Sequence, residues 1–353
     1  MRIAFVWIMG GQRTLSDASL DAGVGGSGAL LILYARTLAA MGHEVSVYAP
    51  IPHGGDHSRA ACHGVSWHHV ATAGYQTGYD AVIAVRSPQP LAGCRAPIRA
   101  LLAVDQSCET LPEAIRDGTC NLLITISQHQ TRRYIAQHGV PEGMILESSA
   151  GVDWGAFTIP TAKAGCIYAS TPERGLVQFA HLWPRIREKV SDARLTVTSG
   201  FELYGWDRAT CARHGGPLYA ALRGLAGVTY AGALSRPAYQ QAMMGAAVMA
   251  YPSVYDEMCC IAALEAAASG TVIVTTDRAA LSERVIDGVT GYLIAGEPGT
   301  PEYDDAFVGR VAELLTQPDK RRTMGRKARE AAAAHDYDVL AAEWVQRFQG
   351  MLA

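Results

Sequence analysis

Two successive series of short apolar strands, with helical segments between them, constrain the fold of this chain more than any other feature. The first series has strands near residues 2–9, 44–48, 80–85, 100–104 and 121–127. The second has strands near residues 165–169, 194–199, 228–231, 247–251 and 272–275. Strands that are apolar throughout fit a parallel sheet with helices on both faces. We therefore expect an α/β protein with two doubly wound, Rossmann-like domains.

The boundary between the two series is expected in residues 151–163, where Pro160 and several small residues mark a linker. We place an N-terminal domain at residues 1–157 and a C-terminal domain at residues 158–337. A last helix, at about residues 338–353, is expected to pack back on the first domain. A length of 353 residues is ample for two such domains.

The composition excludes several classes of protein. A formal net charge of -3 gives no support for nucleic-acid binding, which normally shows in a basic patch. The sequence contains no run of about 18 apolar residues, so we expect no transmembrane helix. Peripheral contact with a membrane is compatible with this composition. The apolar start is interpreted as a buried strand and not as a signal peptide. The eight cysteines form no C-x-x-C pair, so we expect reduced thiols, a cytoplasmic location and no zinc site. The oligomeric state is not set by the sequence.

Two glutamates, Glu257 and Glu265, stand out in the segment 251–270. Glu257 precedes a predicted helix, and Glu265 is placed about two turns inside it. The amides of residues 258–260 (Met258, Cys259 and Cys260) are expected at the helix N-terminus, where free N–H groups favour an anion such as a diphosphate. The alternative is that Glu257 caps the helix and Glu265 is solvated. The apolar neighbours of Glu265 favour a paired or liganded carboxylate instead.

This segment resembles the E-x7-E signature of the retaining GT-B glycosyltransferases of family 4. The Ala-Leu-Glu-Ala run at 263–266 and the stretch at 281–293 are similar to the same family. The resemblance implies a GT-B fold with an interdomain cleft, retention at the anomeric carbon, and contact of Glu257 with the donor sugar and Glu265 with the ribose. Cys259 and Cys260 stand where the family commonly has Phe-Gly, which leaves the shape of the sugar pocket open.

Arg174 follows the first strand of the second series and enters a helix. A guanidinium there could hold phosphate oxygens bidentately, whereas the alternative is an exposed arginine in a first helical turn. The resembling family has an arginine in this loop and a lysine five residues later. Arg174 matches the lysine, and Ala169 or Ser170 falls at the arginine position. We therefore expect this chain to hold a diphosphate with fewer cations.

The glycine-rich run at 23–28 contains Gly25, Gly26 and Ser27, and such loops let the backbone approach phosphate closely. It resembles the family's N-terminal glycine loop, which implies that these three residues lie by the donor phosphates. Asp105 falls where many members carry a polar pair beside the reacting sugar, so we assign it to the catalytic set with Glu257 and Arg174. A helix cap is the alternative for Asp105.

The resulting prediction is a hexosyltransferase-like, metal-independent enzyme that acts on a UDP- or GDP-linked sugar without any other cofactor. Its acceptor is expected to be a carbohydrate or glycoconjugate in glycan or polysaccharide biosynthesis. One alternative is a non-catalytic protein that binds sugar nucleotides. The other is an NAD-dependent oxidoreductase, which is disfavoured because the second strand, 44–48, does not end on the acidic residue that binds the NAD ribose.

Overall fold

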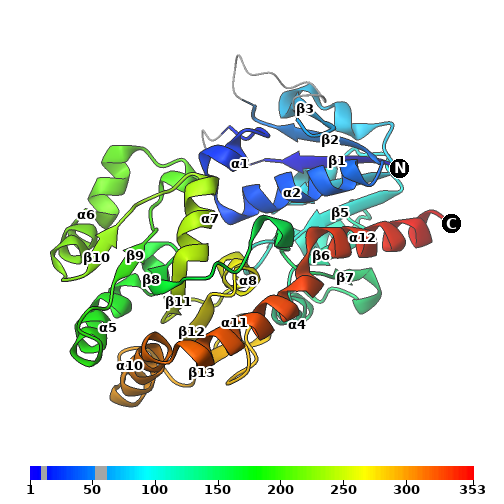
Figure 1. The fold of residues 1–353 in the computed structure, drawn as a ribbon. Helices are drawn as coiled ribbons and strands as arrows, with labels where there is room; N and C mark the ends of the chain where they lie inside the picture. Colours follow the sequence, from blue (N-terminus) through cyan, green and yellow to red (C-terminus); the bar gives the residue numbers. More distant parts are fainter. Residues whose placement is uncertain (9–13, 52–61) are drawn as a thin grey trace. The chain divides into compact units, whose positions relative to one another are not determined.

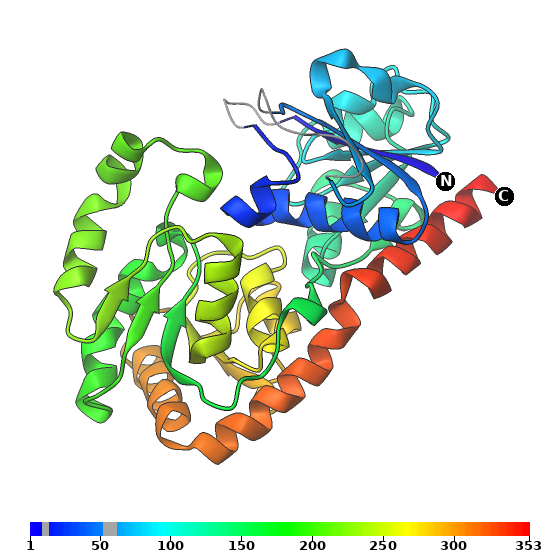
Figure 2. The same ribbon diagram turned by 45° about the horizontal axis from the view of Figure 1, so that its top comes forward.

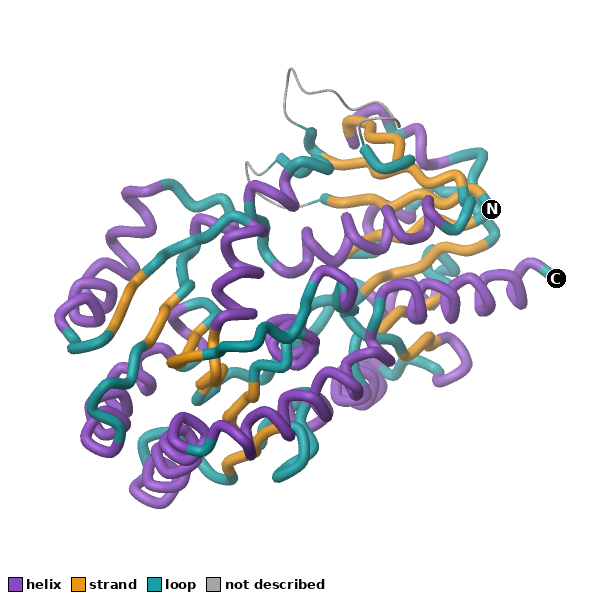
Figure 3. Tube along the Cα trace, viewed as in Figure 1, coloured by secondary structure: helices purple, strands orange, loops and turns teal. Residues whose placement is uncertain are grey.

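The structure, a computed structural model, describes residues 1–8, 14–51 and 62–353. Its contacts divide the chain into two compact units. Unit 1 comprises Met1–Leu20, Val24–Gly151 and Tyr337–Ala353, and unit 2 comprises Asp21–Gly23 and Val152–Asp336. Each unit contains one parallel sheet with helices packed around it, so the predicted α/β class with two Rossmann-like domains is confirmed (Figures 1 and 3).

The sheet of unit 1 has the strand order β3-β2-β1-β4-β5-β6-β7, and every neighbouring pair is parallel. Its strands are β1 (Arg2–Trp7), β2 (Glu44–Ala49), β3 (Val65–His69), β4 (Ala81–Val85), β5 (Ile98–Leu102), β6 (Leu122–Thr125) and β7 (Ile145–Glu147). The central β4 is buried at all its positions, as expected for a strand covered on both faces. The first strand was predicted to reach Met9, which lies outside the described residues.

The helices of unit 1 are α2 (Gly26–Ala40), α3 (Leu111–Arg116), α4 (Gln128–His138) and α12 (Tyr337–Leu352), and the short α1 (Ser19–Ala22) precedes α2 in the chain. The C-terminal α12, red in Figure 2, packs on α2. Trp344 stacks on Tyr34 with 4.0 Å between ring centroids, and its indole N–H donates to the Ser148 hydroxyl at 2.8 Å. The end of the chain therefore contributes to the core of unit 1.

The sheet of unit 2 has the order β10-β9-β8-β11-β12-β13, again with parallel pairs. Its strands are β8 (Ala164–Tyr168), β9 (Leu195–Val197), β10 (Val228–Tyr230), β11 (Ala246–Tyr251), β12 (Val272–Thr276) and β13 (Gly291–Ile294). Its helices are α5 (Leu176–Lys189), α6 (Arg208–Gly224), α7 (Arg236–Gly245), α8 (Ile261–Ala268), α9 (Leu281–Arg284), α10 (Pro301–Thr316) and α11 (Pro318–Ala332).

Short 3₁₀ helices connect these elements. They are η1 (Val70–Thr72), η2 (Gly74–Gln76), η3 (Gln89–Leu91) and η4 (Glu142–Met144) in unit 1, and η5 (Trp154–Ala156), η6 (Pro172–Arg174), η7 (Glu202–Tyr204) and η8 (Ala333–His335) in unit 2. Among the residues that the structure describes, no helix combines the length and the apolar character needed to cross a membrane.

Candidate functional site

The main polar site of unit 2 is built from the loops that follow β8 and β11. These strands are neighbours in the sheet, but the chain continues from β8 to β9 on one side and from β11 to β12 on the other. In open parallel sheets, ligands bind outside the carboxyl ends of the strands at such a switch point. The loop after β8 carries Arg174, and the loop after β11 carries Glu257.

The loop after β8 is pressed against the chain that follows β11. Gly175 has φ +133°, and a Cβ atom built on it would lie 2.2 Å from the Pro252 carbonyl oxygen, so only glycine fits there. The backbone N–H of Val254 donates to the carbonyl of Arg174 at 3.3 Å. Arg174 is the last residue of η6, a 3₁₀ turn directly before α5, and its side chain is 26% exposed, so it is not the exposed arginine of the alternative.

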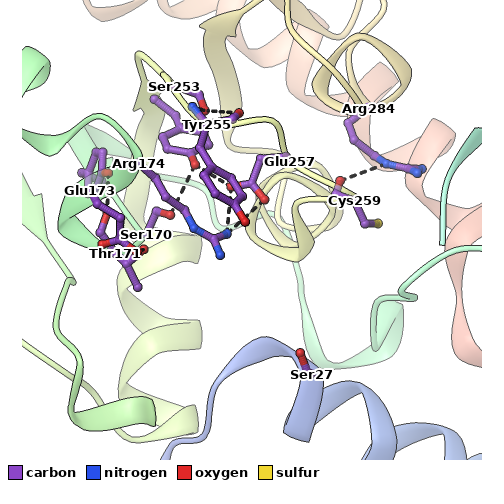
Figure 4. Close-up of polar contacts among 12 residues, drawn as sticks. Ser27, Ser170, Thr171, Glu173, Arg174, Ser253, Tyr255, Glu257, Cys259 and Arg284 are labelled. Atoms are coloured by element: carbon purple, nitrogen blue, oxygen red, sulfur yellow. Dashed lines mark hydrogen bonds and ion pairs between the residues drawn. The ribbon is translucent and has the colours of Figure 1, made fainter. Parts of the chain in front are cut away.

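Arg174 and Glu257 form an ion pair (Figure 4). The Nη1 atom of Arg174 lies 3.0 Å from each carboxylate oxygen of Glu257, whose residue is 5% exposed. The guanidinium also lies over the ring of Tyr255, at 4.3 Å from the centroid. A carboxylate this deeply buried requires a partner, and the arginine supplies it. Glu257 therefore does not act as a helix cap.

Tyr251, the last residue of β11, holds the same carboxylate. Its hydroxyl donates to Glu257 Oε1 at 2.6 Å and lies 3.3 Å from the hydroxyl of Ser170. Burial and the charge of Glu257 raise the pKa of Tyr251 well above its usual range, so the phenol remains a donor. Burial is the largest single effect on Arg174 and opposes its charge, but Glu257 and the neighbouring tyrosines together outweigh burial and raise the pKa of the guanidinium. The guanidinium therefore stays charged beside the Glu257 carboxylate.

The guanidinium of Arg174 keeps capacity for a further ligand. Glu257 uses only Nη1, and an arginine has five N–H donors. The Nε atom is buried and, within the described parts of the chain, has no hydrogen-bond partner. A buried donor without an acceptor costs free energy until an oxygen atom pairs with it. This arrangement suits a phosphate oxygen that binds while Glu257 stays in place.

The helix that carries Glu265 begins later than the sequence predicted. It starts at Ile261, and Cys260 is its N-cap, with a left-handed φ of 64° and no capping bond from its side chain. The backbone amides of Met258, Cys259 and Cys260 thus precede the helix instead of forming its first turn, and Glu265 lies one turn inside it. The left-handed residue, which the sequence pattern does not announce, ends the loop abruptly and shifts the helix start.

Glu265 is 3% exposed and has two protein partners in place of solvent. Arg236 Nη1 donates to its Oε1 at 2.5 Å, and the hydroxyl of Tyr239 donates to its Oε2 at 2.6 Å. Both partners lie on α7, which packs on α8. The solvated alternative for Glu265 is therefore wrong. Since each carboxylate oxygen accepts about two bonds, capacity for a ligand hydroxyl is left.

Unit 1 holds the remaining predicted residues. Gly25 is the N-cap of α2, and Gly26 and Ser27 form its first turn. Asp105 follows β5 and pairs with Arg86, a residue that the sequence analysis did not select; Arg86 Nη1 lies 3.1 Å from Asp105 Oδ1. Asp105 is therefore an ion-pair partner, and caps no helix.

The sequence analysis did not assign Tyr251, Tyr255 or Arg236 to the predicted site. Tyr251 ends an otherwise apolar strand, and an aromatic hydroxyl in that place is the one available signal. For Arg86, the signal is a charged residue directly after the five apolar residues of β4. Arg236 gave no local signal, because its partner Glu265 lies 29 residues away in the chain.

The second unit is similar to known glycosyltransferases. Residues 164–317 match the family described as glycosyl transferases group 1. The chain is 36% identical to D-inositol 3-phosphate glycosyltransferase of Kribbella flavida over 108 residues, which are 31% of this chain and 24% of that protein. It is 35% identical to the protein of the same name from Nocardia farcinica over 112 residues, or 32% and 22%. The chain thus spans about a quarter of the length of these curated relatives.

The similarity to solved structures extends over the whole chain. Sucrose-phosphate synthase from Thermosynechococcus elongatus aligns with a TM-score of 0.73 at 17% identity, covering 99% of both chains. This alignment confirms the predicted GT-B fold. The match to group 1 confirms the resemblance that the motifs of the second unit indicated.

Proposed function

We propose that this chain, whose residues 164–317 match the family described as glycosyl transferases group 1, is a retaining glycosyltransferase. It would move a sugar from a nucleotide-diphosphate donor to an acceptor hydroxyl in glycan, polysaccharide or glycoconjugate biosynthesis, with no metal or other cofactor. The observation that carries the proposal is the ion pair of Arg174 with the buried Glu257 at the carboxyl ends of β8 and β11.

The roles of the pair follow from its chemistry. As the bond between the anomeric carbon and the diphosphate oxygen breaks, negative charge grows on the leaving group, and the guanidinium of Arg174 can stabilise it. Glu257 can accept hydrogen bonds from the donor sugar's hydroxyls. Because Arg174 and Tyr251 already hold both of its oxygens, we assign Glu257 to sugar binding and not to nucleophilic attack. The acceptor oxygen forms the new glycosidic bond as the nucleoside diphosphate leaves, and the acceptor proton passes to a diphosphate oxygen or to water.

We assign the binding site of the donor nucleotide to α8 and the side chains that contact it. Glu265 would accept from the ribose hydroxyls while Arg236 and Tyr239 fix its carboxylate in one orientation. A uridine or guanosine diphosphate sugar is the proposed donor. Support for uridine comes from HepE of Anabaena, whose structure was solved with UDP-glucose and aligns with a TM-score of 0.71 at 15% identity over 99% of this chain and 100% of HepE.

The decisive experiment is a thermal-shift screen against UDP-, GDP-, ADP-, CMP- and dTDP-linked sugars, with NAD as a comparison. A ligand at 100 times its Kd stabilises the native state by about 2.7 kcal/mol, so the correct nucleotide should stand out. Transfer is then followed by NMR at the anomeric proton, where retention gives a product with the donor's configuration. Binding without transfer to any acceptor would favour the non-catalytic alternative, and stabilisation by NAD alone would overturn the proposal.

A further inference from the structure

A second polar cluster lies in unit 1, at the carboxyl ends of the strands of its own sheet. Arg86 follows β4, Asp105 follows β5, and Ser27 lies in the first turn of α2, which comes after β1. Arg86 Nη2 donates to the Ser27 hydroxyl at 2.9 Å, and Nη1 pairs with Asp105 Oδ1 at 3.1 Å. Since β1 and β4 are the neighbours from which the chain leaves in opposite directions, the cluster occupies the switch point of this sheet.

The backbone at Arg86 is strained. Its φ is +73°, in the left-handed region that costs energy for any residue with a Cβ atom. Such conformations persist where the surroundings hold them, and they concentrate at functional sites. Here the consequence is visible, because the turn brings the guanidinium to both Ser27 and Asp105.

Two side chains of α4 fix the backbone of Asp105. Its backbone carbonyl accepts from Gln130 Nε2 at 2.9 Å and from the Tyr134 hydroxyl at 3.3 Å. Gln130 is fully buried, and its Oε1 accepts from the N–H of Ile126 at 2.9 Å, so this side chain cannot move without losing two bonds. With its backbone fixed, Asp105 keeps 41% of its side chain exposed, beside an Arg86 side chain that is 30% exposed.

We propose that Arg86 and Asp105 bind an uncharged hydroxyl of the acceptor and disfavour a phosphate or carboxylate in that place, while Ser27 accepts a hydrogen bond from Arg86 and orients its guanidinium. A hydroxyl can donate to Asp105 and accept from Arg86, whereas the charged oxygens of an anion only accept and are repelled by the negative charge of Asp105. The arginine charge is already compensated by its partner, so it offers an anion little net attraction. This inference rests on the proposed function, since it assigns the acceptor class of the same enzyme.

The test is a set of NMR titrations of the full chain, followed at the backbone amides of these three residues. The probes are glucose, myo-inositol and inorganic phosphate, with no nucleotide present. In the wild type, at least one of the two polyols should shift these amides. Asp105→Asn should weaken that polyol by roughly tenfold, because a charged acceptor becomes neutral. The same variant should bind phosphate about ten- to a hundredfold more tightly, because Arg86 loses its counter-charge.

Two further variants make the result specific. Glu44→Gln changes the net charge by the same amount. It removes the ion pair with Arg2, which lies 3.5 Å away at the amino ends of β1 and β2 in the same sheet. This control should leave both affinities unchanged. Adding Arg86→Gln to Asp105→Asn should abolish the gain in phosphate binding. Melting curves establish that each variant is folded.

Several results would overturn the inference. The first is a phosphate affinity that is the same in the wild type and in Asp105→Asn, or a gain in phosphate affinity that is equally large in Glu44→Gln. The second is a polyol affinity that Asp105→Asn does not weaken, or the absence of any amide shift with either polyol. Donor binding is measured separately by the thermal-shift screen. A chain that binds no nucleotide sugar would refute the proposed function while leaving the titrations readable.

Discussion

Replacing Arg174 by alanine removes the cation from the buried pair and tests both stability and catalysis. Breaking a buried ion pair by removing one partner costs about 3–5 kcal/mol. We expect the lower end, because Tyr251 still donates to Glu257 and 26% of the arginine side chain is exposed. Loss of the contact with the Tyr255 ring adds about 0.5–1 kcal/mol. The free energy of unfolding should therefore fall by about 3–4 kcal/mol.

The catalytic effect of Arg174→Ala should exceed what instability explains. If the guanidinium faces charge that grows in the transition state, both kcat and donor affinity fall. We expect kcat/KM to drop by roughly 10²–10³-fold, comparable to the loss of one oxyanion donor. Arg174→Lys keeps the charge but loses the planar fork, so it should recover part of the activity.

Two comparisons separate stability from catalysis. Adding Glu257→Gln to Arg174→Ala removes the uncompensated buried charge, so stability should recover in large part while activity stays low. Arg36→Ala breaks another buried pair, in which Arg36 donates to Asp17 at 2.8 and 2.7 Å, and should lower stability without changing kcat. Urea unfolding and donor kinetics below the melting transition supply both quantities. Wild-type kinetics in folded Arg174→Ala protein would refute the phosphate role.

Three further outcomes are expected. Glu265→Gln should weaken binding of the free nucleotide by about 1–2 kcal/mol in calorimetry, because a charge-assisted bond to the ribose becomes neutral, and an unchanged Kd would remove Glu265 from the site. Activity should survive EDTA, and complete loss that manganese restores would contradict metal independence. Burial, and to a lesser extent the charge of Arg284, lower the pKa of His335 to about 4 in the folded chain. Between pH 6.5 and pH 4 this histidine is therefore protonated in the unfolded chain but neutral in the folded chain. The free energy of unfolding should fall by roughly 2–3 kcal/mol towards pH 4, and urea titrations should show a smaller fall in His335→Gln.

The fold was predictable from the sequence because buried parallel strands are apolar throughout. The strands that the analysis missed are β3, β7 and β13, and each lies at an edge of its sheet. β3 alternates between buried and partly exposed positions, and β7 is partly exposed or exposed at all three. β3 and β7 are covered less than the central strands, so their sequences lack the continuous apolar run. β13 is buried at three of its four positions, so exposure does not explain why it was missed. The central strands, which position the two polar sites, carry that signal in full.

The site was predictable as a set of chemical types but not as a set of partners. Arg174 and Glu257 were both selected, yet their ion pair joins residues 83 positions apart and needs the register of β8 beside β11. Glu265 was expected to have a partner, but Arg236 sits on another helix. The helix start was wrong because Cys260 adopts a left-handed conformation that no residue preference at that position announces. Local sequence patterns therefore predict which single residues belong to a site, but not which residues pair with one another in the folded chain.

The two sheets place the same kind of pair at their switch points, with one difference that matters for function. Glu257 is 5% exposed and is held by Arg174 and Tyr251, so its geometry is set before any ligand arrives. In the Arg86–Asp105 pair both side chains are about one-third exposed, and water competes for their hydrogen bonds. A fixed site suits a constant ligand such as a diphosphate sugar, since no reorganisation opposes the charge that develops. A solvated pair of donor and acceptor can exchange its partners for hydroxyls at little cost, which suits the more variable acceptor.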